Sequence, residues 1–212
     1  MTDQVGMFNE MQIDVFREIG NIGSSSAATA LSKIVEKRID LSLPKVRILN
    51  FNEISQVVGG EEELVIGILQ PMGGDLKGNI MFLLRLKEAH DLASILISRM
   101  LKKEPDSRQE LGLFDEMELS ALREIGNILI SSYLSAISGL TGLSITPSVP
   151  AMAMDMAGAI LSVLTIEFGK ISDKVLYIES TFSQDHIKVG GDFFLVPDIA
   201  SFGTLLHALG VH

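Results

Sequence analysis

Residues 16–34 read FREIGNIGSSSAATALSKI, and residues 122–140 read LREIGNILISSYLSAISGL. Ten of these nineteen aligned positions are identical, and the run REIGNI at 17–22 and 123–128 is copied whole. The offset is 106 residues, half of the 212-residue chain. Because a buried core alone would not require the same charged and amide residues twice, the repeat indicates a duplicated unit that has kept a surface feature.

The repeat predicts the same order of elements in each half. Each half opens with a possible capping box, Asn9 with Gln12 and Asp115 with Glu118, so long helices are expected over residues 10–37 and 116–139. Gly139 and Gly142 lie where a glycine commonly ends a helix. The remaining expected elements are extended runs from Pro44 and Pro150, short helices at 52–58 and 157–167, strands at 63–72, 78–86, 174–182 and 190–197, and closing helices at 87–101 and 198–210.

These elements predict a mixed α/β fold of the α+β kind, with a mostly antiparallel sheet flanked by long helices. We expect one compact domain built from two halves, about 1–106 and 107–212, related by a pseudo-twofold axis. A polar linker at 101–114, which contains Pro105, joins the halves.

Composition narrows the function classes. With 47% hydrophobic and 21% charged residues the chain is a globular protein. It has no cysteine and only four scattered histidines, so we expect no metal bound by this chain. A net charge of −10 disfavours nucleic-acid binding. With no signal peptide and no membrane-spanning run, we expect a cytoplasmic protein, and a monomer.

A helical wheel at about 100° per residue separates two faces of the first long helix. Asp14, Glu18 and Asn21 share a polar stripe that Ser25, Ala28 and Ser32 continue. The opposite, apolar face is formed by Phe16, Ile19, Gly23, Ala27, Ala30 and Ile34. The small residues Gly20, Gly23 and Ala27 indicate close approach of a neighbouring element.

The second long helix repeats the arrangement. Its polar stripe is Ser120, Glu124, Asn127 and Ser131, and its apolar face is Leu122, Ile125, Leu129, Tyr133, Ala136 and Leu140. Ile130 and Leu134 lie on or beside the polar stripe, where they meet either a partner or, more simply, a neighbour in the same chain.

A single Glu-x-x-Asn on a helix usually does no more than solvate a surface. Here the buried neighbours diverged between the halves, Gly23 to Leu129 and Ala27 to Tyr133, while the exposed Glu and Asn were kept. Since asparagine is a mediocre helix former, helix propensity gives no reason to keep it. The pattern therefore favours a functional pair in each half.

The chemistry open to such a pair is limited, because no histidine stands at a predictable spacing from Ser25 or Ser131 to activate it. Hydrolysis of a phosphoryl group depends mainly on positioning and charge stabilisation. A neutral carboxamide can orient a water molecule without repelling the phosphoryl group, and a Glu one turn away can pair with a cation on a partner.

Both copies match a known pattern: Asp or Ser, three residues, Glu, two residues, Asn, twenty-two residues, Pro. The matching residues are Asp14, Glu18, Asn21 and Pro44 in the first half and Ser120, Glu124, Asn127 and Pro150 in the second. The chain thus resembles the CheC/CheX/FliY family of chemotaxis phosphatases over essentially its whole length. Two complete copies favour the two-site members over the CheX branch, and the extra C-terminal domain of FliY-like members is not seen.

The resemblance implies a phosphatase that dephosphorylates the response regulator phospho-CheY. Asn21 and Asn127 would position the attacking water, and Glu18 and Glu124 would pair with the regulator's lysine. Magnesium would be held by the regulator, with no cofactor on this chain. The resemblance also implies the receptor deamidase CheD as a partner, and we expect the segment at 152–159, tested by Asp155→Lys, to contribute to that contact.

Three other interpretations stay open. A non-enzymatic module could dock a response regulator or CheD through the same stripes, and a flagellar switch component would need a rotor-binding segment. The segment at 152–159 could also be a buried strand and short helix. Alternating Met152, Met154 and Met156 are expected to fill a core or interface. Gly73-Gly74 and Gly190-Gly191 are expected to form hairpin turns.

Overall fold

The computed structural model describes residues 10–101, 114–168, 174–184 and 187–210. The first half forms α1 (Glu10–Val35), β1 (Asp40–Leu41), β2 (Lys45–Asn50), a 3₁₀ turn η2 (Phe51–Glu53), α2 (Ile54–Val57), β3 (Leu64–Gly74), β4 (Gly78–Arg85) and α3 (Leu86–Leu101). The second half forms α4 (Glu116–Thr141), β5 (Ile145–Pro147), β6 (Ala151–Met156), α5 (Ala157–Phe168), β7 (Lys174–Gln184), β8 (Ile187–Pro197) and α6 (Ile199–Ala208).

The strands form one eight-stranded sheet in the order β1-β7-β8-β4-β3-β5. β2 pairs with β7 on the β1 side, and β6 pairs with β3 on the β5 side. Each pairing among the described strands is antiparallel. The predicted mixed fold with a mostly antiparallel sheet is therefore confirmed.

The strand register shows the predicted twofold relation between the halves. Lys45 of β2 pairs with Glu179, and Ala151 of β6, 106 residues later, pairs with Leu69. At the centre of the sheet, Phe82 of β4 pairs with Phe193 of β8, and their rings stack with centroids 4.5 Å apart. The approximate axis passes between these two rings, so β7 occupies in one half the place of β3 in the other.

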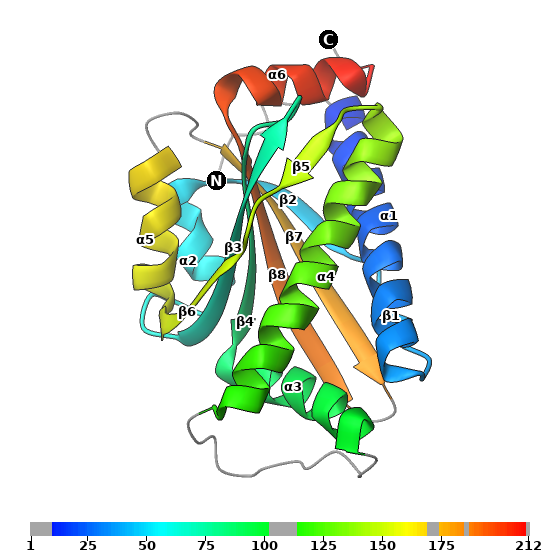
Figure 1. The fold of residues 1–212 in the computed structure, drawn as a ribbon. Coiled ribbons are helices and arrows are strands. Elements are labelled where there is room, and N and C mark those ends of the chain that lie inside the picture. The colour runs from blue at the N-terminus through cyan, green and yellow to red at the C-terminus, as the bar shows by residue number, and fades with distance from the viewer. Residues whose placement is uncertain (1–9, 102–113, 169–173, 185–186, 211–212) are drawn as a thin grey trace.

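The elements form three layers (Figure 1). α1 and α4 lie side by side and antiparallel over one face of the sheet, with α3 at one end and α6 at the other. α2 and α5 cover the opposite face. Each face has its own apolar core, because strand side chains alternate between the two sides.

Close packing of α1 on α4 and on the sheet explains the repeated small residues. A Cβ at Gly23 would overlap the ring of Tyr133 on α4. A Cβ at Gly20 would overlap Val46 of β2, and one at Gly126 would overlap Ile68 of β3. The glycine of each REIGNI run therefore lets its helix approach the sheet, as the sequence predicted.

The helix boundaries agree with the prediction where the structure describes them. Asp115 Oδ1 accepts from the Glu118 amide at 2.8 Å, and Glu118 Oε2 accepts from the Asp115 amide at 2.9 Å, so the second capping box is confirmed. Gly142 ends α4 with a φ of 70°. The cap expected at Asn9 and the linker around Pro105 lie outside the described residues.

Two minor expectations are wrong. Gly190 and Gly191 lie inside β8 and not in a turn, because a Cβ at Gly191 would overlap the ring of Phe82. Of the three methionines on β6, Met152 packs against the core as expected, whereas Met154 and Met156 are 45% and 50% exposed and do not fill it; among the described strands β6 pairs with β3 alone. Gly73 and Gly74 are likewise the last two residues of β3, paired with Thr146 and Ile145; Gly74 has a φ of 95°, and the turn to β4 follows at 75–77.

We predict opposite effects for two Gly→Ala changes in the long helices. Gly23→Ala should lower the free energy of unfolding by roughly 1–3 kcal/mol, because the added methyl group collides with Tyr133. Gly139→Ala, on an exposed turn of α4 with no atom within 4 Å of the new Cβ, should raise it by up to about 1 kcal/mol. Chemical denaturation measures both, and equal stability of the two variants would contradict the packing described.

Candidate functional site

The polar stripe of α1 faces solvent, as the wheel predicted. Glu18 and Asn21 are exposed one turn apart, which places them on one side of the helix. Asp14, one turn before Glu18, is exposed and accepts a hydrogen bond from Arg17 Nη1 at 2.7 Å. The motif therefore leaves its carboxylate and carboxamide accessible to a partner.

Asn21 opens into a cleft of about 630 Å³ at the edge of the sheet. The motif proline, Pro44, lines the same cleft, so the structure brings together two residues that are 23 positions apart. Lys45 pairs with Glu179 at 2.9 Å, and the guanidinium of Arg47 lies 4.9 Å from the centre of the Tyr177 ring. The full lining is Arg17, Asn21, Leu43, Pro44, Lys45, Val46, Arg47 and Glu179.

The second copy of the motif lies at the opposite edge of the same layer, beside β3 and β6. Ser120 and Glu124 are exposed, whereas Asn127 and Pro150 are half-buried. Gln70 of β3, only 2% exposed, donates from Nε2 to the Ser148 carbonyl at 2.8 Å and to Asn127 Oδ1 at 3.5 Å. The second asparagine is thus held by a buried amide.

The first asparagine lacks this support, because Ser180 occupies the position that corresponds to Gln70. Ser180 follows Glu179 on β7 as Gln70 follows Leu69 on β3. It is fully buried and its hydroxyl bonds to Ser24 at 2.9 Å and to Tyr133 at 2.7 Å. Asn21 stays exposed, so the two copies of the motif share residues but differ in how the carboxamide is held.

Ser24, Tyr133 and Ser180 form a closed ring of three buried hydroxyls between α1, α4 and β7. Each hydroxyl can donate one hydrogen bond and accept another, so all three are satisfied without water. Burial raises the pKa of Tyr133 to about 12, an effect that the bonds to Ser180 and Ser24 partly offset. The ring links the middle of α1 and the second half of α4 to β7.

The wheel misplaced several residues of the predicted stripes. Ala28 is 7% exposed, and Ile130 and Leu134 are 0% and 3% exposed, so all three belong to the core. The simpler explanation for Ile130 and Leu134, packing within the same chain, is confirmed. Leu140, expected to be buried, is 38% exposed near the end of α4.

A buried polar pair, Tyr177 and Asp192, lies on the face of the sheet opposite α1 and α4. Asp192 is 5% exposed and accepts a hydrogen bond from the Tyr177 hydroxyl at 2.7 Å. Burial raises the pKa of Asp192 to about 6, while the Tyr177 bond and the charge of Arg85 lower it. No residue of either motif contacts this pair among the contacts described, and we assign it to the core.

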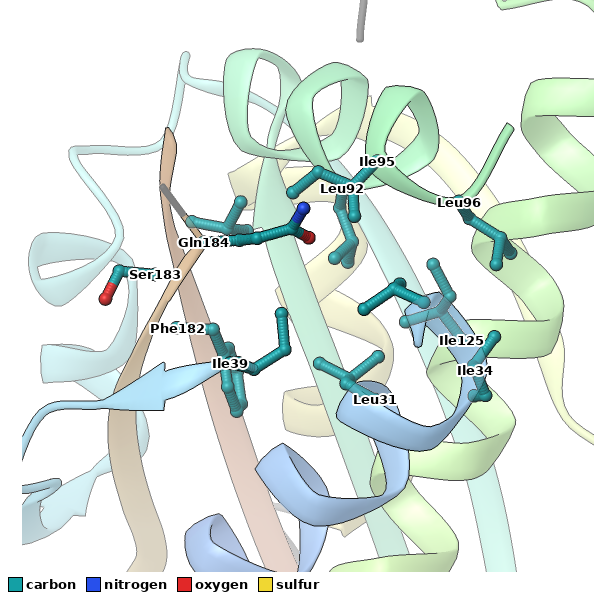
Figure 2. Close-up of a pocket in the computed structure, with 12 residues that line it drawn as sticks. Leu31, Ile34, Ile39, Leu92, Ile95, Leu96, Ile125, Phe182, Ser183 and Gln184 are labelled. Carbon is teal, nitrogen blue, oxygen red and sulfur yellow. The ribbon is translucent and has the colours of Figure 1, made fainter. Parts of the chain in front are cut away.

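A further cavity lies between α1, α3 and the ends of β7 and β8 (Figure 2). It leaves only about 10 Å³ of free space, and its lining is mostly aliphatic, with Leu31, Leu92 and Ile125 among the side chains. Gln184 points its amide towards the aliphatic side chains of α3. This volume holds about one water molecule, so the cavity is a packing gap of the core.

The described residues hold no group of three or more His, Asp and Glu that could bind a metal ion. No described helix combines the length and apolar character needed to cross a bilayer. Each motif surface offers a carboxylate and a carboxamide one turn apart; the carboxamide is exposed in the first copy and half-buried in the second. Such a pair can bind a cation and orient a small hydrogen-bonding molecule beside a group brought by a partner.

The first copy was fully visible in the sequence, but its surroundings were not. Lys45 and Arg47 lie one and three residues after the motif proline, so the alternation of side chains along a strand could have identified them as neighbours of the site. Gln70 carries no local signal, since it lies 57 residues from Asn127 and meets it only in the folded protein.

Comparison with known proteins supports the resemblance noted in the sequence. The family model described as the CheC-like family matches residues 11–48 and 117–153, the two segments that contain the complete motifs. CheY-P phosphatase CheC of Bacillus subtilis (strain 168) is 36% identical over 204 residues, which cover 95% of each chain. Flagellar motor switch phosphatase FliY of the same organism is 28% identical over 147 residues, covering 69% of this chain and 36% of FliY.

The crystal structure of Thermotoga maritima FliY superposes with a TM-score of 0.75 at 20% identity, covering 96% of this chain and 98% of that one. At this identity the similarity shows a common fold. The relationship to the Bacillus subtilis protein extends over nearly the whole length of both. The chain belongs to the CheC-like family.

Proposed function

We propose that this protein is a phosphatase that hydrolyses the aspartyl-phosphate of a CheY-class response regulator. The observation that carries the proposal is the Glu and Asn pair, present twice and one turn apart on α1 and α4; both residues are exposed in the first copy, and in the second Glu124 is exposed while Asn127 is half-buried. The 36% identical relative named as a CheY-P phosphatase supports the same substrate class.

In the proposed reaction the oxygen of a water molecule attacks phosphorus in line with the bond to the aspartyl oxygen. That bond breaks, and the products are inorganic phosphate and the free carboxylate of the regulator. Because an aspartyl-phosphate is a mixed anhydride with a good leaving group, orientation of the water is the main requirement. The carboxamide of Asn21 or Asn127 accepts a hydrogen bond from that water and holds it in line.

Glu18 and Glu124 have a separate proposed role. Each carboxylate pairs with a lysine of the docked regulator and fixes the position of the helix relative to the phosphoryl group. Mg²⁺ is supplied by the regulator in this proposal, so this chain contributes only side chains that position and bind.

We further propose that the edge strand β6 contacts the receptor deamidase CheD. Leu64, Met154 and Met156 expose apolar surface at this edge, with 48%, 45% and 50% of each residue accessible. Asp155 is exposed between the two methionines, and its Oδ1 accepts a hydrogen bond from the Met156 amide at 2.7 Å. Exposed methionines next to a free strand edge suit a protein partner.

A docking module that hydrolyses nothing would use the same stripes, and it is the alternative function. Exposure of Glu18 and Asn21 is compatible with both functions. Docking and hydrolysis place different demands on the asparagine carboxamide. Docking would tolerate its replacement by a carboxylate with a moderate loss of affinity, whereas positioning of water beside an anionic phosphoryl group would not.

We predict that changing Asn21 and Asn127 together to Ala lowers regulator-stimulated phosphate release by roughly 100-fold or more, while each single change leaves residual activity. The melting temperature should stay unchanged, since neither side chain lies in the core. The double Asn→Asp variant should still bind the phosphorylated regulator but release no additional phosphate. Undiminished turnover in either double variant would rule out this mechanism.

Gln70 should matter to the second site alone. In an Asn21→Ala background, Gln70→Met should reduce phosphate release roughly two- to tenfold, because Asn127 loses its hydrogen bond to a buried amide. In an Asn127→Ala background the same change should leave turnover unaltered, which makes it the matched control. A comparable loss in both backgrounds would mean that Gln70 acts through the fold and not through Asn127.

Asp155→Lys should abolish binding of CheD, as measured by calorimetry, because it reverses the charge of an exposed side chain within the proposed contact strand. Asp155→Asn keeps an acceptor for the Met156 amide and serves as the control for local structure. If the Lys variant binds CheD as tightly as the unmodified protein, β6 is not the contact.

A further inference from the structure

The two most exposed large hydrophobic residues of the described chain occupy corresponding positions. Leu43 is 86% exposed and Val149 is 87% exposed, against 71% for the next, Ile166. They lie 106 residues apart, and each directly precedes the motif proline, in SLP at 42–44 and SVP at 148–150. Duplication alone would have copied an exposed aliphatic residue, but it would not have kept it.

The surroundings of these residues did change. Lys45 and Arg47 in the first half correspond to Ala151 and Ala153 in the second, and Glu179 corresponds to Leu69. The charges on the strands beside the two prolines therefore differ between the halves, whereas an exposed branched aliphatic side chain is present in both. A lone exposed aliphatic residue is ordinary, but its retention at maximal exposure beside both motifs requires a cause.

Both loops hold the aliphatic residue in a defined place. The Ser42 amide donates to the Thr181 carbonyl at 3.1 Å, and the Ser148 amide donates to the Pro71 carbonyl at 2.8 Å. The two bonds correspond to each other. Thr181 follows Ser180 on β7, Pro71 follows Gln70 on β3, and Ser180 and Gln70 occupy equivalent positions. The proline that comes next restricts the backbone of Leu43 and of Val149 to extended conformations.

Each aliphatic residue also lies next to its asparagine. Leu43 lines the same cleft as Asn21 and Pro44. Val149 follows Ser148, whose carbonyl accepts from Gln70 Nε2, the atom that also reaches Asn127. A partner that reaches Asn21 in this cleft therefore meets Leu43 as well, and the corresponding position of Val149 extends the same expectation to the second site.

We propose that Leu43 and Val149 are the docking anchors of the two sites, each inserted into an apolar depression that the response regulator presents beside its phosphorylated aspartate. This inference rests on the proposed function, and it identifies the apolar part of the surface that contacts the response regulator. Because the backbone of each loop is already held in place, ordering it on binding costs little further conformational entropy. A few residues that fill pockets on the partner carry much of the affinity of a protein interface, and burial of an exposed aliphatic side chain is favourable in itself.

The test uses variants in which one site is silent. Leu43→Ser in the Asn127→Ala background and Val149→Ser in the Asn21→Ala background should each raise the KM for the phosphorylated regulator roughly tenfold, with kcat changed by no more than about twofold. Leu43→Ser in the Asn21→Ala background should have no effect, since the first site is then already silent. Ile199→Ser, at a 67% exposed aliphatic residue on α6, is the matched surface control and should leave both constants unchanged.

Calorimetry with a beryllofluoride-activated regulator separates the anchors from the proposed function. If the single-site parents release no phosphate, the proposed phosphatase function fails, and weaker binding of the Ser variants still supports the anchors. An unchanged KM and unchanged binding in both Ser variants would overturn the inference, as would a loss in kcat alone. An equal loss in Ile199→Ser would also overturn it, because the effect would then reflect surface hydrophobicity in general.

Discussion

Contact between α1 and α4 over the central strands determines what the surface of this protein can present. The ring of Tyr133 fits over Gly23 because the glycine has no side chain, and its hydroxyl closes the buried ring with Ser24 and Ser180. The symmetry-related pair is Ala27 with Leu129, again one small and one large residue, so the two halves exchange volume while the sum stays similar. With their inner faces committed to each other and to the sheet, the helices direct both polar stripes outward, to opposite edges.

Much of this arrangement could be predicted from the repeat. The offset of 106 residues paired the long helices, the motif prolines and the strands that follow them correctly, and the capping box at Asp115 located the start of α4. The order of the strands in the sheet could not be predicted. It depends on which strand of each hairpin pairs with the other half, and in the structure β4 pairs with β8 at Phe82 and Phe193. The glycines at 190 and 191 misled for a physical reason: both lie in a strand, where Gly191 makes room for the ring of Phe82, and glycine is also common in turns.

The motif residues of both sites were predicted, but the difference between the sites was not. A helical wheel treats every position on one side alike, whereas packing of α4 buries Ile130 and half-buries Asn127. Gln70 and Ser180 are related by the twofold axis, yet one reaches an asparagine and the other completes the hydroxyl ring. Contacts between side chains that are far apart in the sequence produce no regular spacing of residues, so they can be identified only in the folded structure.

Covalent joining of the two halves has an evolutionary consequence. In a symmetric homodimer, any substitution beside one motif would appear beside the other as well. Here the strand after Pro44 carries Lys45 and Arg47, while the strand after Pro150 carries Ala151 and Ala153. One gene can thus keep an original surface at one edge of the sheet and remodel the other, so that a single molecule accumulates two specialised faces without losing the ancestral one.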